Sequence, residues 1–284
     1  MKRWLILDVH YLCHRAFHST QNLTHNQKGS GVVFGFLKSI THLKDEFGTD
    51  NIAFCFEHPH LFRRDIYPQY KRKRTTVERT DEEKVLYESL IIQISELQKR
   101  YLPRIGFKNI FSYRGMESDD TMARIAEIYK EEAEIILVTA DNDMLQCLDD
   151  NVSIWNPATR KRKTVEWFER EYKLDPRKWA VVKAIAGCSS DEVEGIKGVG
   201  EKTAVKFLRG ILPTKSKAYQ SIVSSQGKAI VRRNRALVRL PYEGCPTPAL
   251  VVDEVNRAGW RDVCGMLGMR SIASTPPIAT RTRK

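Results

Sequence analysis

Acidic side chains occur in three separate segments, at positions where they could together bind metal ions. Asp8 directly follows an apolar run at residues 4–7, and Asp141 comes shortly after a second apolar run at residues 135–138. Three more acids lie within residues 117–120, at the start of a predicted helix. If the apolar runs are parallel strands, their carboxyl ends meet at one edge of a sheet, where ligands bind in open α/β folds. Like charges gathered there repel one another unless cations neutralise them, and oxygen ligands without His or Cys select Mg²⁺ or Mn²⁺.

This acidic pattern has more than one chemical interpretation. Metals held by carboxylates beside a basic surface favour phosphodiester hydrolysis, in which a metal-activated water attacks in line. Phosphatases of the Asp-x-Asp type also place acids at strand ends. Acids at a helix start, such as Glu117 and Asp120, also cap the helix and complement its dipole. The spacing alone leaves these alternatives open.

A glycine-rich segment lies between two predicted helices. The segment reads Gly-Ile-Lys-Gly-Val-Gly at residues 195–200 and is preceded by a helical pattern at residues 179–186. A dinucleotide-binding turn would need a preceding strand, so a helix–hairpin–helix is the better interpretation. That motif binds a DNA backbone through glycines and a helix N-terminus without reading the base sequence. Ala204 permits close packing of the second helix, and a simple turn between helices is the alternative.

Four consecutive cations follow Tyr70, over residues 71–74, and precede a long amphipathic stretch at residues 81–102. The tyrosine offers a surface on which a base can stack, which favours contact with a single strand. A solvated loop is the alternative.

Strands and helices alternate over about the first 175 residues. The patterns predict buried strands at residues 4–7, 51–56, 109–112 and 135–138, and helices at residues 31–47, 81–102 and 117–131. This alternation indicates a parallel sheet covered on both faces, which is a three-layer α/β fold. Helical patterns dominate after residue 175.

The composition excludes several classes of protein. With 284 residues, 42% of them hydrophobic, the chain can bury a sizeable core. No apolar run approaches the about 18 residues of a membrane helix, and the run at residues 4–7 is too short for a signal peptide. We therefore expect a cytoplasmic protein without a membrane partner. Six scattered cysteines without a C-x-x-C pair predict neither a zinc cluster nor disulfides.

The charge balance indicates a polyanionic partner. The chain has 47 Lys and Arg against 35 Asp and Glu, a net charge of +12. A generic basic surface is the alternative. All seven histidines lie within the first 60 residues, so a site built from the middle of the chain must rely on carboxylates. His10, His14 and His18 could share one helix face, which we interpret as polar or DNA-facing rather than as a metal site.

The order of these motifs resembles the 5′ nuclease family of flap endonucleases and 5′→3′ exonucleases. The carrying residues are Asp8, Tyr70-Lys71-x-x-Arg74, Glu117-x-Asp119-Asp120, Asp141-x-Asp143, Asp191 and Gly198-Val199-Gly200. The resemblance spans about residues 4–240 and is strongest to the stand-alone enzymes of bacteriophages. It implies a PIN-like core at residues 1–174 with a helical arch at about 67–102. A helix–hairpin–helix region would cover residues 175–270, and a disordered tail residues 271–284.

The resemblance also implies residue roles and cofactors. The first metal ion would be held by Asp8, Glu117, Asp119 and Asp141, with Asp120 contributing directly or through water. Asp143 and Asp191 match the second metal site. Two Mg²⁺ or Mn²⁺ ions are expected, and a K⁺ ion at the helix–hairpin–helix.

Contacts to DNA are implied at the arch and at the helix–hairpin–helix. Lys71 would steer the scissile phosphate and, with Arg74, neutralise the charge that develops on it, while Tyr70 would stack on a terminal base. The remaining expected contacts with nucleic acid are Arg15, Lys183, Gly198, Gly200 and Lys202.

Three positions depart from the family pattern. The segment Gly-Cys-Ser-Ser-Asp at residues 187–191 has Cys188 where the family has an aspartate, which weakens the second metal site because a thiol is a poor Mg²⁺ ligand. Val9 replaces a glycine, and Glu57 stands one position closer to Phe62 than the expected aspartate, for which its longer side chain could substitute. Glu192 could compensate at the second site.

We therefore expect a monomeric, Mg²⁺-dependent 5′ nuclease that acts on the 5′ end or flap of DNA in replication or repair. A catalytically weakened protein that binds DNA junctions is one alternative. A nuclease that removes RNA primers from RNA/DNA hybrids is another, because phosphate and stacking contacts do not sense the 2′-hydroxyl.

Overall fold

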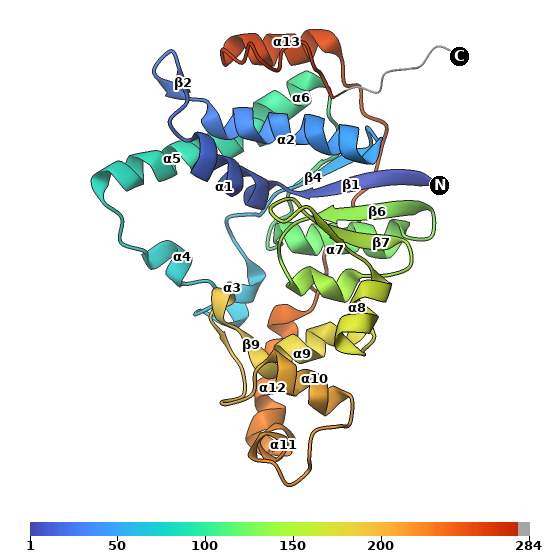
Figure 1. The fold of residues 1–284 in the computed structure, drawn as a ribbon. Helices are drawn as coiled ribbons and strands as arrows, with labels where there is room; N and C mark the ends of the chain where they lie inside the picture. Colours follow the sequence, from blue (N-terminus) through green and yellow to red (C-terminus); the bar gives the residue numbers. More distant parts are fainter. Residues whose placement is uncertain (278–284) are drawn as a thin grey trace.

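A six-stranded sheet forms the centre of the molecule in the computed structural model, which describes residues 1–277 (Figure 1). The strand order is β5-β4-β1-β6-β7-β8, and the first five strands are parallel, while β8 runs antiparallel to β7. The strands are β1 (Lys2–Asp8), β4 (Ile52–Cys55), β5 (Ile110–Phe111), β6 (Ala133–Val138), β7 (Val152–Asn156) and β8 (Lys161–Lys163). The central strands β1, β4 and β6 are apolar on both faces, as a sheet covered on both sides requires.

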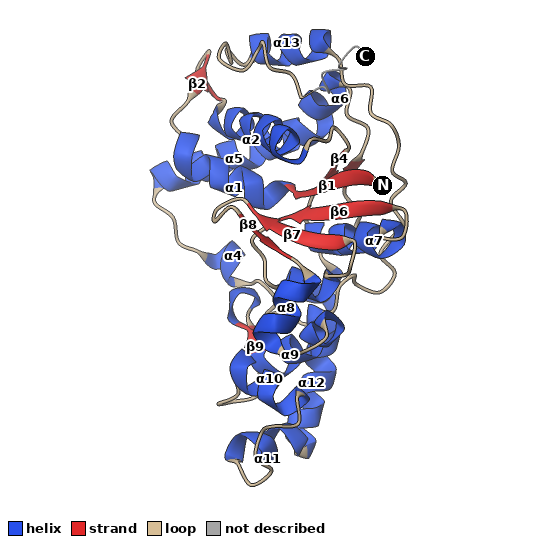
Figure 2. Ribbon diagram, turned by 45° about the vertical axis from the view of Figure 1, so that its right-hand side comes forward, coloured by secondary structure: helices blue, strands red, loops and turns tan. Residues whose placement is uncertain are grey.

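Helices cover both faces of this sheet, so the predicted three-layer α/β architecture is confirmed (Figure 2). One face packs against α1 (Val9–Thr20), α2 (Gly31–Phe47), α5 (Asp81–Glu96), α6 (Leu102–Ile105) and α13 (Arg257–Met266). The other face packs against α7 (Ser118–Tyr129), α8 (Val165–Tyr172) and α9 (Trp179–Ala186). The side chains of β1 alternate between the two cores, with Leu5 and Leu7 on one side and Trp4 and Ile6 on the other.

The predicted arch leaves the compact core between β4 and β5. It follows α3 (Phe62–Ile66) and includes α4 (Lys73–Thr76) and the first turns of α5, which are drawn at the left of Figure 1. Thr80 and Glu83 form a capping box that starts α5, because each side chain accepts a hydrogen bond from the other residue's backbone N–H. Beyond α5 the chain continues through a π-helical turn (Leu97–Tyr101) into α6, so the stretch predicted at residues 81–102 is helical throughout.

A second helical region extends below the core in the view of Figure 1, next to α3. It contains α9, α10 (Glu201–Leu208), α11 (Lys217–Val223) and α12 (Ser225–Val238), with α11 at the far end (Figure 1). Strands β9 (Gly187–Cys188) and β10 (Val193–Glu194) form a short antiparallel pair between α9 and α10. Gly195 has no space for a side chain, because a Cβ there would lie 2.1 Å from the carbonyl oxygen of Ala186.

The C-terminal segment returns to the core, which corrects the boundary expected at residue 270. Helix α13 packs beside α6 at the end of the molecule opposite α11, and Trp260 is buried there with its indole N–H donated to the carbonyl of Ile272. This apolar packing removes α13 from the second helical region. Of the tail expected at residues 271–284, Ile272 is buried in the core, and residues 278–284 lie outside the described residues. Among residues 1–277, no helix is both long and apolar enough to cross a membrane.

Candidate metal centre and nucleic-acid interface

The candidate site lies at the carboxyl ends of the central strands. Asp8 ends β1, Asp141 follows β6, and Glu57 follows β4, while Glu117 is the N-cap of α7. The chain crosses over one face of the sheet between β1 and β4 and over the other face on the way to β6. Strands β1 and β6 are therefore a topological switch point, which is the usual ligand-binding position in such sheets.

Asp8 is held in a fixed orientation by three donors. Its Oδ1 accepts hydrogen bonds from the Tyr11 backbone N–H at 3.1 Å and the Ser118 hydroxyl at 3.3 Å. Its Oδ2 accepts one from the Thr139 hydroxyl at 3.2 Å. Burial raises the pKa of Asp8, and the negative charges of Asp141 and Glu57 add to that effect.

Asp119 gives the clearest indication that this site suits a cation. Its Oδ1 is buried and has no hydrogen-bond partner among the described residues. Burial first, and then the charges of Asp141 and Asp8, raise the pKa of Asp119 well above its ordinary value of 3.8. A buried carboxylate oxygen without a partner is costly, and a cation would satisfy it. Because the donors here are carboxylate oxygens, the residues fit a hard divalent cation.

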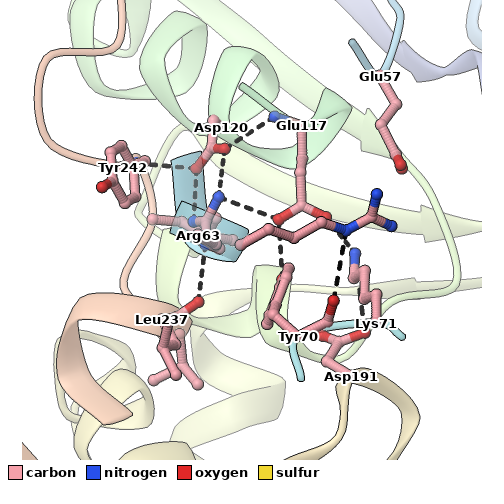
Figure 3. A network of polar contacts seen from close by, with 12 residues as sticks. Glu57, Arg63, Tyr70, Lys71, Glu117, Asp120, Asp191, Leu237 and Tyr242 are labelled. Atoms are coloured by element: carbon pink, nitrogen blue, oxygen red, sulfur yellow. Dashed lines mark hydrogen bonds and ion pairs between the residues drawn. The ribbon is translucent and has the colours of Figure 1, made fainter. Parts of the chain in front are cut away.

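The Glu117 carboxylate is buried and is surrounded by the hydroxyl and cationic groups of neighbouring side chains (Figure 3). Its Oε2 accepts the Tyr70 hydroxyl at 2.8 Å and lies 3.0 Å from a guanidinium nitrogen of Arg63, while its Oε1 pairs with the Lys71 ammonium. Burial alone would raise the pKa of Glu117, but the positive charges of Lys71 and Arg63 outweigh it and lower that pKa to about 2. Glu117 is therefore ionised at any pH at which the protein works.

The contacts of Asp120 argue against a direct role as a metal ligand. Both of its oxygens pair with Arg63, at 2.6 and 2.7 Å, and they also accept the backbone N–H groups of Glu117 at 2.9 Å and Tyr242 at 2.8 Å (Figure 3). These four donors occupy the lone pairs of the carboxylate, and the side chain is fully buried. Asp120 instead joins the start of α7 to Arg63 and to the segment after α12.

A second cluster of potential ligands lies beside β9. Ligand atoms of Asp143, Cys188 and Asp191 all lie within 4.8 Å of one another, and the Cys188 thiol lies 3.5 Å from an Asp191 oxygen. Burial and the charge of Asp141 raise the pKa of Asp143 to about 6. The backbone N–H of Lys73 donates to the Glu192 carboxylate, so Glu192 faces the arch. The structure thus brings Asp143 and Asp191 together as expected and places Cys188 between them.

Two cationic side chains at the base of the arch lie next to the carboxylates. The Lys71 ammonium is buried and lies 3.7 Å from Asp191, in addition to its contact with Glu117. Arg74 is half-exposed and lies 3.3 Å from Asp191 and 3.8 Å from Glu57. Glu57 thus comes to the edge of the site and points toward Arg74.

Two of the expected DNA contacts are occupied inside the protein. Tyr70 is only 3% exposed and donates to Glu117, so its ring offers no stacking surface to a base. Lys183 is also buried, with its ammonium 2.9 Å from both Asp143 and Glu201, and the charge of Asp143 raises its pKa against the effect of burial. Arg15 is exposed on α1, as a phosphate contact requires.

The helix–hairpin–helix has the expected geometry. Gly198 has a left-handed backbone with φ of 77°, and Gly200 is the N-cap of α10. A Cβ at either glycine would meet nothing within 4 Å, so the hairpin backbone faces open space that a ligand can enter. Lys202 is exposed in the first turn of α10, and Ala204 is fully buried against the core, as predicted. Backbone N–H groups at this helix start suit a phosphate.

The sequence analysis assigned no role to several residues that shape the site. Arg63, Ser118 and Thr139 orient the carboxylates of Glu117, Asp120 and Asp8 through the contacts given above. An arginine is rarely placed in a core, and no local pattern at residue 63 distinguishes it from its exposed neighbours.

Comparisons with known proteins identify relatives of this chain. The family profile described as the 5′-3′ exonuclease N-terminal resolvase-like domain matches residues 3–173. The thermostable DNA polymerase I of Thermus thermophilus is 33% identical over 211 residues, which cover 73% of this chain and 24% of the polymerase. The 5′-3′ exonuclease of Bacillus subtilis is 33% identical over 217 residues, covering 72% of this chain and 69% of the relative. This chain therefore spans about a quarter of the polymerase relatives.

Solved structures with the same fold include an exonuclease of bacteriophage T5 and the catalytic core of Rad2. The T5 5′-exonuclease with bound divalent metal ions (zinc) superposes with a TM-score of 0.72 at 24% identity, covering 84% of this chain and 90% of that one. The catalytic core of Rad2 in complex with a DNA substrate has a TM-score of 0.60 at 14% identity, covering 96% and 91%. At these identities the likeness shows the fold.

Proposed function

This chain belongs to the 5′-3′ exonuclease family, and on that premise we propose that it is a metal-dependent 5′ nuclease that hydrolyses DNA phosphodiesters near a 5′ end or flap junction. The observation that carries this proposal is the buried, unpartnered Asp119 oxygen beside Asp8 and Asp141 at the switch point of the sheet. The net charge of +12 and the open hairpin at Gly198 and Gly200 supply the surface for the polyanionic substrate.

The first metal ion would be held by Asp8, Asp119 and Asp141, with Glu117 next to them. A divalent cation at such a site lowers the pKa of a bound water and polarises the phosphodiester. Ser118 and Thr139 keep Asp8 in one orientation, so the ligands are pre-positioned. We propose Mg²⁺ as the natural ion because the donors are hard oxygens, with Mn²⁺ as a substitute.

Lys71 and Arg74 are the residues we assign to the scissile phosphate. Both lie at the boundary between the carboxylates and the base of the arch, through which a single strand would pass. A phosphate that approaches the metal centre would meet the exposed part of the Arg74 guanidinium directly, whereas it would reach the buried Lys71 ammonium only by displacing the contacts of Lys71 with Glu117 and Asp191. Each cation would stabilise the negative charge that builds up on the phosphate in the transition state.

The second cluster would bind Mg²⁺ weakly. Its donors are the Asp143 and Asp191 carboxylates and the Cys188 thiol, and a thiol is a soft ligand that suits Mg²⁺ poorly. This feature favours one alternative function, a protein that binds DNA junctions and cleaves them slowly. For either activity we propose a monomer that acts in replication or repair in the cytoplasm, within the host if a phage encodes it.

Cleavage of a 5′-end-labelled flap DNA in Mg²⁺ tests the proposal, with an EDTA control and an all-RNA flap in parallel. We expect metal-dependent product near the junction from DNA. Tight binding of the flap without product in Mg²⁺ or Mn²⁺ would favour the junction-binding alternative. Cleavage of the RNA flap in preference to DNA would move the substrate to RNA.

A further inference from the structure

Arg63 is the most completely bonded charged side chain at the site, and the proposed catalysis leaves it without a role. It is 1% exposed and lies in α3, at the base of the arch. One guanidinium nitrogen contacts Asp120 at 2.6 Å and Glu117 at 3.0 Å, and the other contacts Asp120 at 2.7 Å and the Arg239 carbonyl at 3.2 Å. Its Nε donates to the Leu237 carbonyl at 2.8 Å. The side chain therefore donates four hydrogen bonds, to Asp120 and to the two carbonyls, and its contact with Glu117 is an ion pair.

These contacts connect three parts of the chain that are distant in sequence (Figure 3). Asp120 and Glu117 belong to the start of α7, and the two carbonyls lie at the C-terminal end of α12. Carbonyls at a helix C-terminus carry partial negative charge and attract a cation. The Tyr242 ring completes the enclosure, with the guanidinium carbon 5.0 Å from the ring centroid. Arg63 thus anchors α7 to the helical region that would bind duplex DNA.

The contact between Arg63 and Glu117 helps to set the orientation of the Glu117 carboxylate. Arg63 and the Tyr70 hydroxyl both bind Oε2, which leaves Oε1 directed toward Lys71 and Asp191. Groups that contact a metal-binding carboxylate on the side away from the metal fix its orientation. Their loss commonly lowers metal affinity or activity substantially. Only the planar guanidinium fork can reach both carboxylates and both carbonyls, because an ammonium has fewer donors and no fork.

We propose that Arg63 is a positioning residue that orients the Glu117 carboxylate for metal binding and holds that orientation from the end of α12. This inference rests on the proposed function in one respect, that Glu117 belongs to the metal centre. Arg63 itself touches neither metal nor substrate in this arrangement.

Mn²⁺ affinity, measured by calorimetry on the DNA-free full chain, is the primary test because it does not require cleavage. Arg63→Lys keeps the positive charge and removes the fork. We expect Mn²⁺ affinity to fall by about 10- to 100-fold, the range typical of lost outer-shell partners. The kcat for flap cleavage should fall with it, while KM for the DNA stays unchanged. Arg177→Lys is the matched control, because Arg177 also pairs with an aspartate, Asp175, but at the exposed surface.

A double-mutant cycle distinguishes orientation of Glu117 from a general structural role. If Arg63 acts through Glu117, Arg63→Lys should cause no further loss of Mn²⁺ affinity in a Glu117→Gln background. An equal loss in both backgrounds would overturn the proposal, as would a folded Arg63→Lys protein with unchanged Mn²⁺ affinity. If Arg63→Lys does not fold, the paired variant Arg63→Gln with Asp120→Asn removes both charges and is judged by the same criteria.

Two further outcomes are also decisive. If neither Arg63 variant folds, Arg63 is a structural residue and the proposal is wrong. If the wild-type protein binds Mn²⁺ but does not cleave DNA, the proposed function fails, while the calorimetric comparison still decides the role of Arg63.

Discussion

Replacing Asp119 by asparagine should stabilise the metal-free protein while abolishing cleavage. The Oδ1 atom of Asp119 is buried and unpartnered, and the negative charges of Asp141 and Asp8 act on this carboxylate. Carboxylates that lie together without a cation destabilise the folded protein, whereas the neutral amide of asparagine can donate an N–H to a neighbouring carboxylate. Asparagine has nearly the same shape and removes one of these charges, so we expect a gain of about 1–3 kcal/mol in the free energy of unfolding in EDTA. For a chain of this size each kcal/mol raises the melting temperature by about 2–4 °C.

The pH dependence gives this prediction a second, independent readout. Burial and the neighbouring acids raise the pKa of Asp119 above 3.8, so the folded protein binds a proton there more tightly than the unfolded chain. Stability in EDTA therefore decreases as the pH rises from 3.8 through the raised pKa, and the full penalty is present above it. The advantage of Asp119→Asn should be largest above the raised pKa of Asp119 and should shrink as the pH is lowered toward 3.8.

Thermal unfolding with and without Mg²⁺ completes the experiment. Saturating Mg²⁺ should raise the melting temperature of the wild-type protein, because a ligand at about 100 times its Kd adds about 2.7 kcal/mol. Asp119→Asn should show no such increase, while its affinity for a flap DNA in Ca²⁺ or EDTA remains close to wild type. A lower melting temperature of Asp119→Asn in EDTA, or a parallel loss of DNA affinity, would show that Asp119 is structural and refute the reasoning.

Three further predictions concern the second cluster and the hairpin. Cys188→Asp should strengthen Mg²⁺ binding and raise kcat at low Mg²⁺. When both proteins are titrated with Cd²⁺, the wild-type protein should show a thiolate-to-metal absorption band and Cys188→Asp should not. Because the pKa of Asp143 is raised to about 6, binding of Mn²⁺ at this cluster should weaken as the pH falls through that value, and Asp143→Asn should remove that dependence in calorimetry. Lys202→Ala should weaken binding of duplex DNA equally for unrelated sequences and reduce the salt slope by about 1, whereas a change confined to one sequence would contradict backbone recognition.

The central strands that precede Asp8 and Asp141 were predictable because short, continuous stretches of the sequence specify them. Residues 4–7 are a continuous apolar run, and such a run becomes a strand buried on both faces. Parallel pairing then brings Asp8 and Asp141 to one edge whatever the details of the loops. For the same reason the helix at residues 31–47 was predicted with its observed bounds, since its apolar residues recur at helical spacing.

The errors at the site share a different cause, which is that the partners of a charged side chain come from remote parts of the chain. Asp120 was expected to bind metal, but its oxygens pair with Arg63 and with the backbone of Tyr242. Tyr70 and Lys183 were expected to contact DNA, but each is buried against an acid that the fold brings to it. No local pattern specifies these pairings, because they depend on how the arch and α12 pack on the core.

The internal pairing of charges supports the proposed position of the first metal ion. Within the described part of the chain, Arg63 compensates Asp120, Lys71 compensates Glu117, Arg74 lies beside Asp191 and Glu57, and Lys183 compensates Asp143. Residues 1–277 show no ion pair for the remaining carboxylates of the site, Asp8, Asp119 and Asp141. Ionised carboxylates placed together without a cation repel one another, and here Asp8 is buried, as is the Oδ1 atom of Asp119. A divalent cation bound among the three would supply the positive charge that cationic side chains supply to the other carboxylates of the site, so we expect this position to bind metal more tightly than the cluster at Cys188.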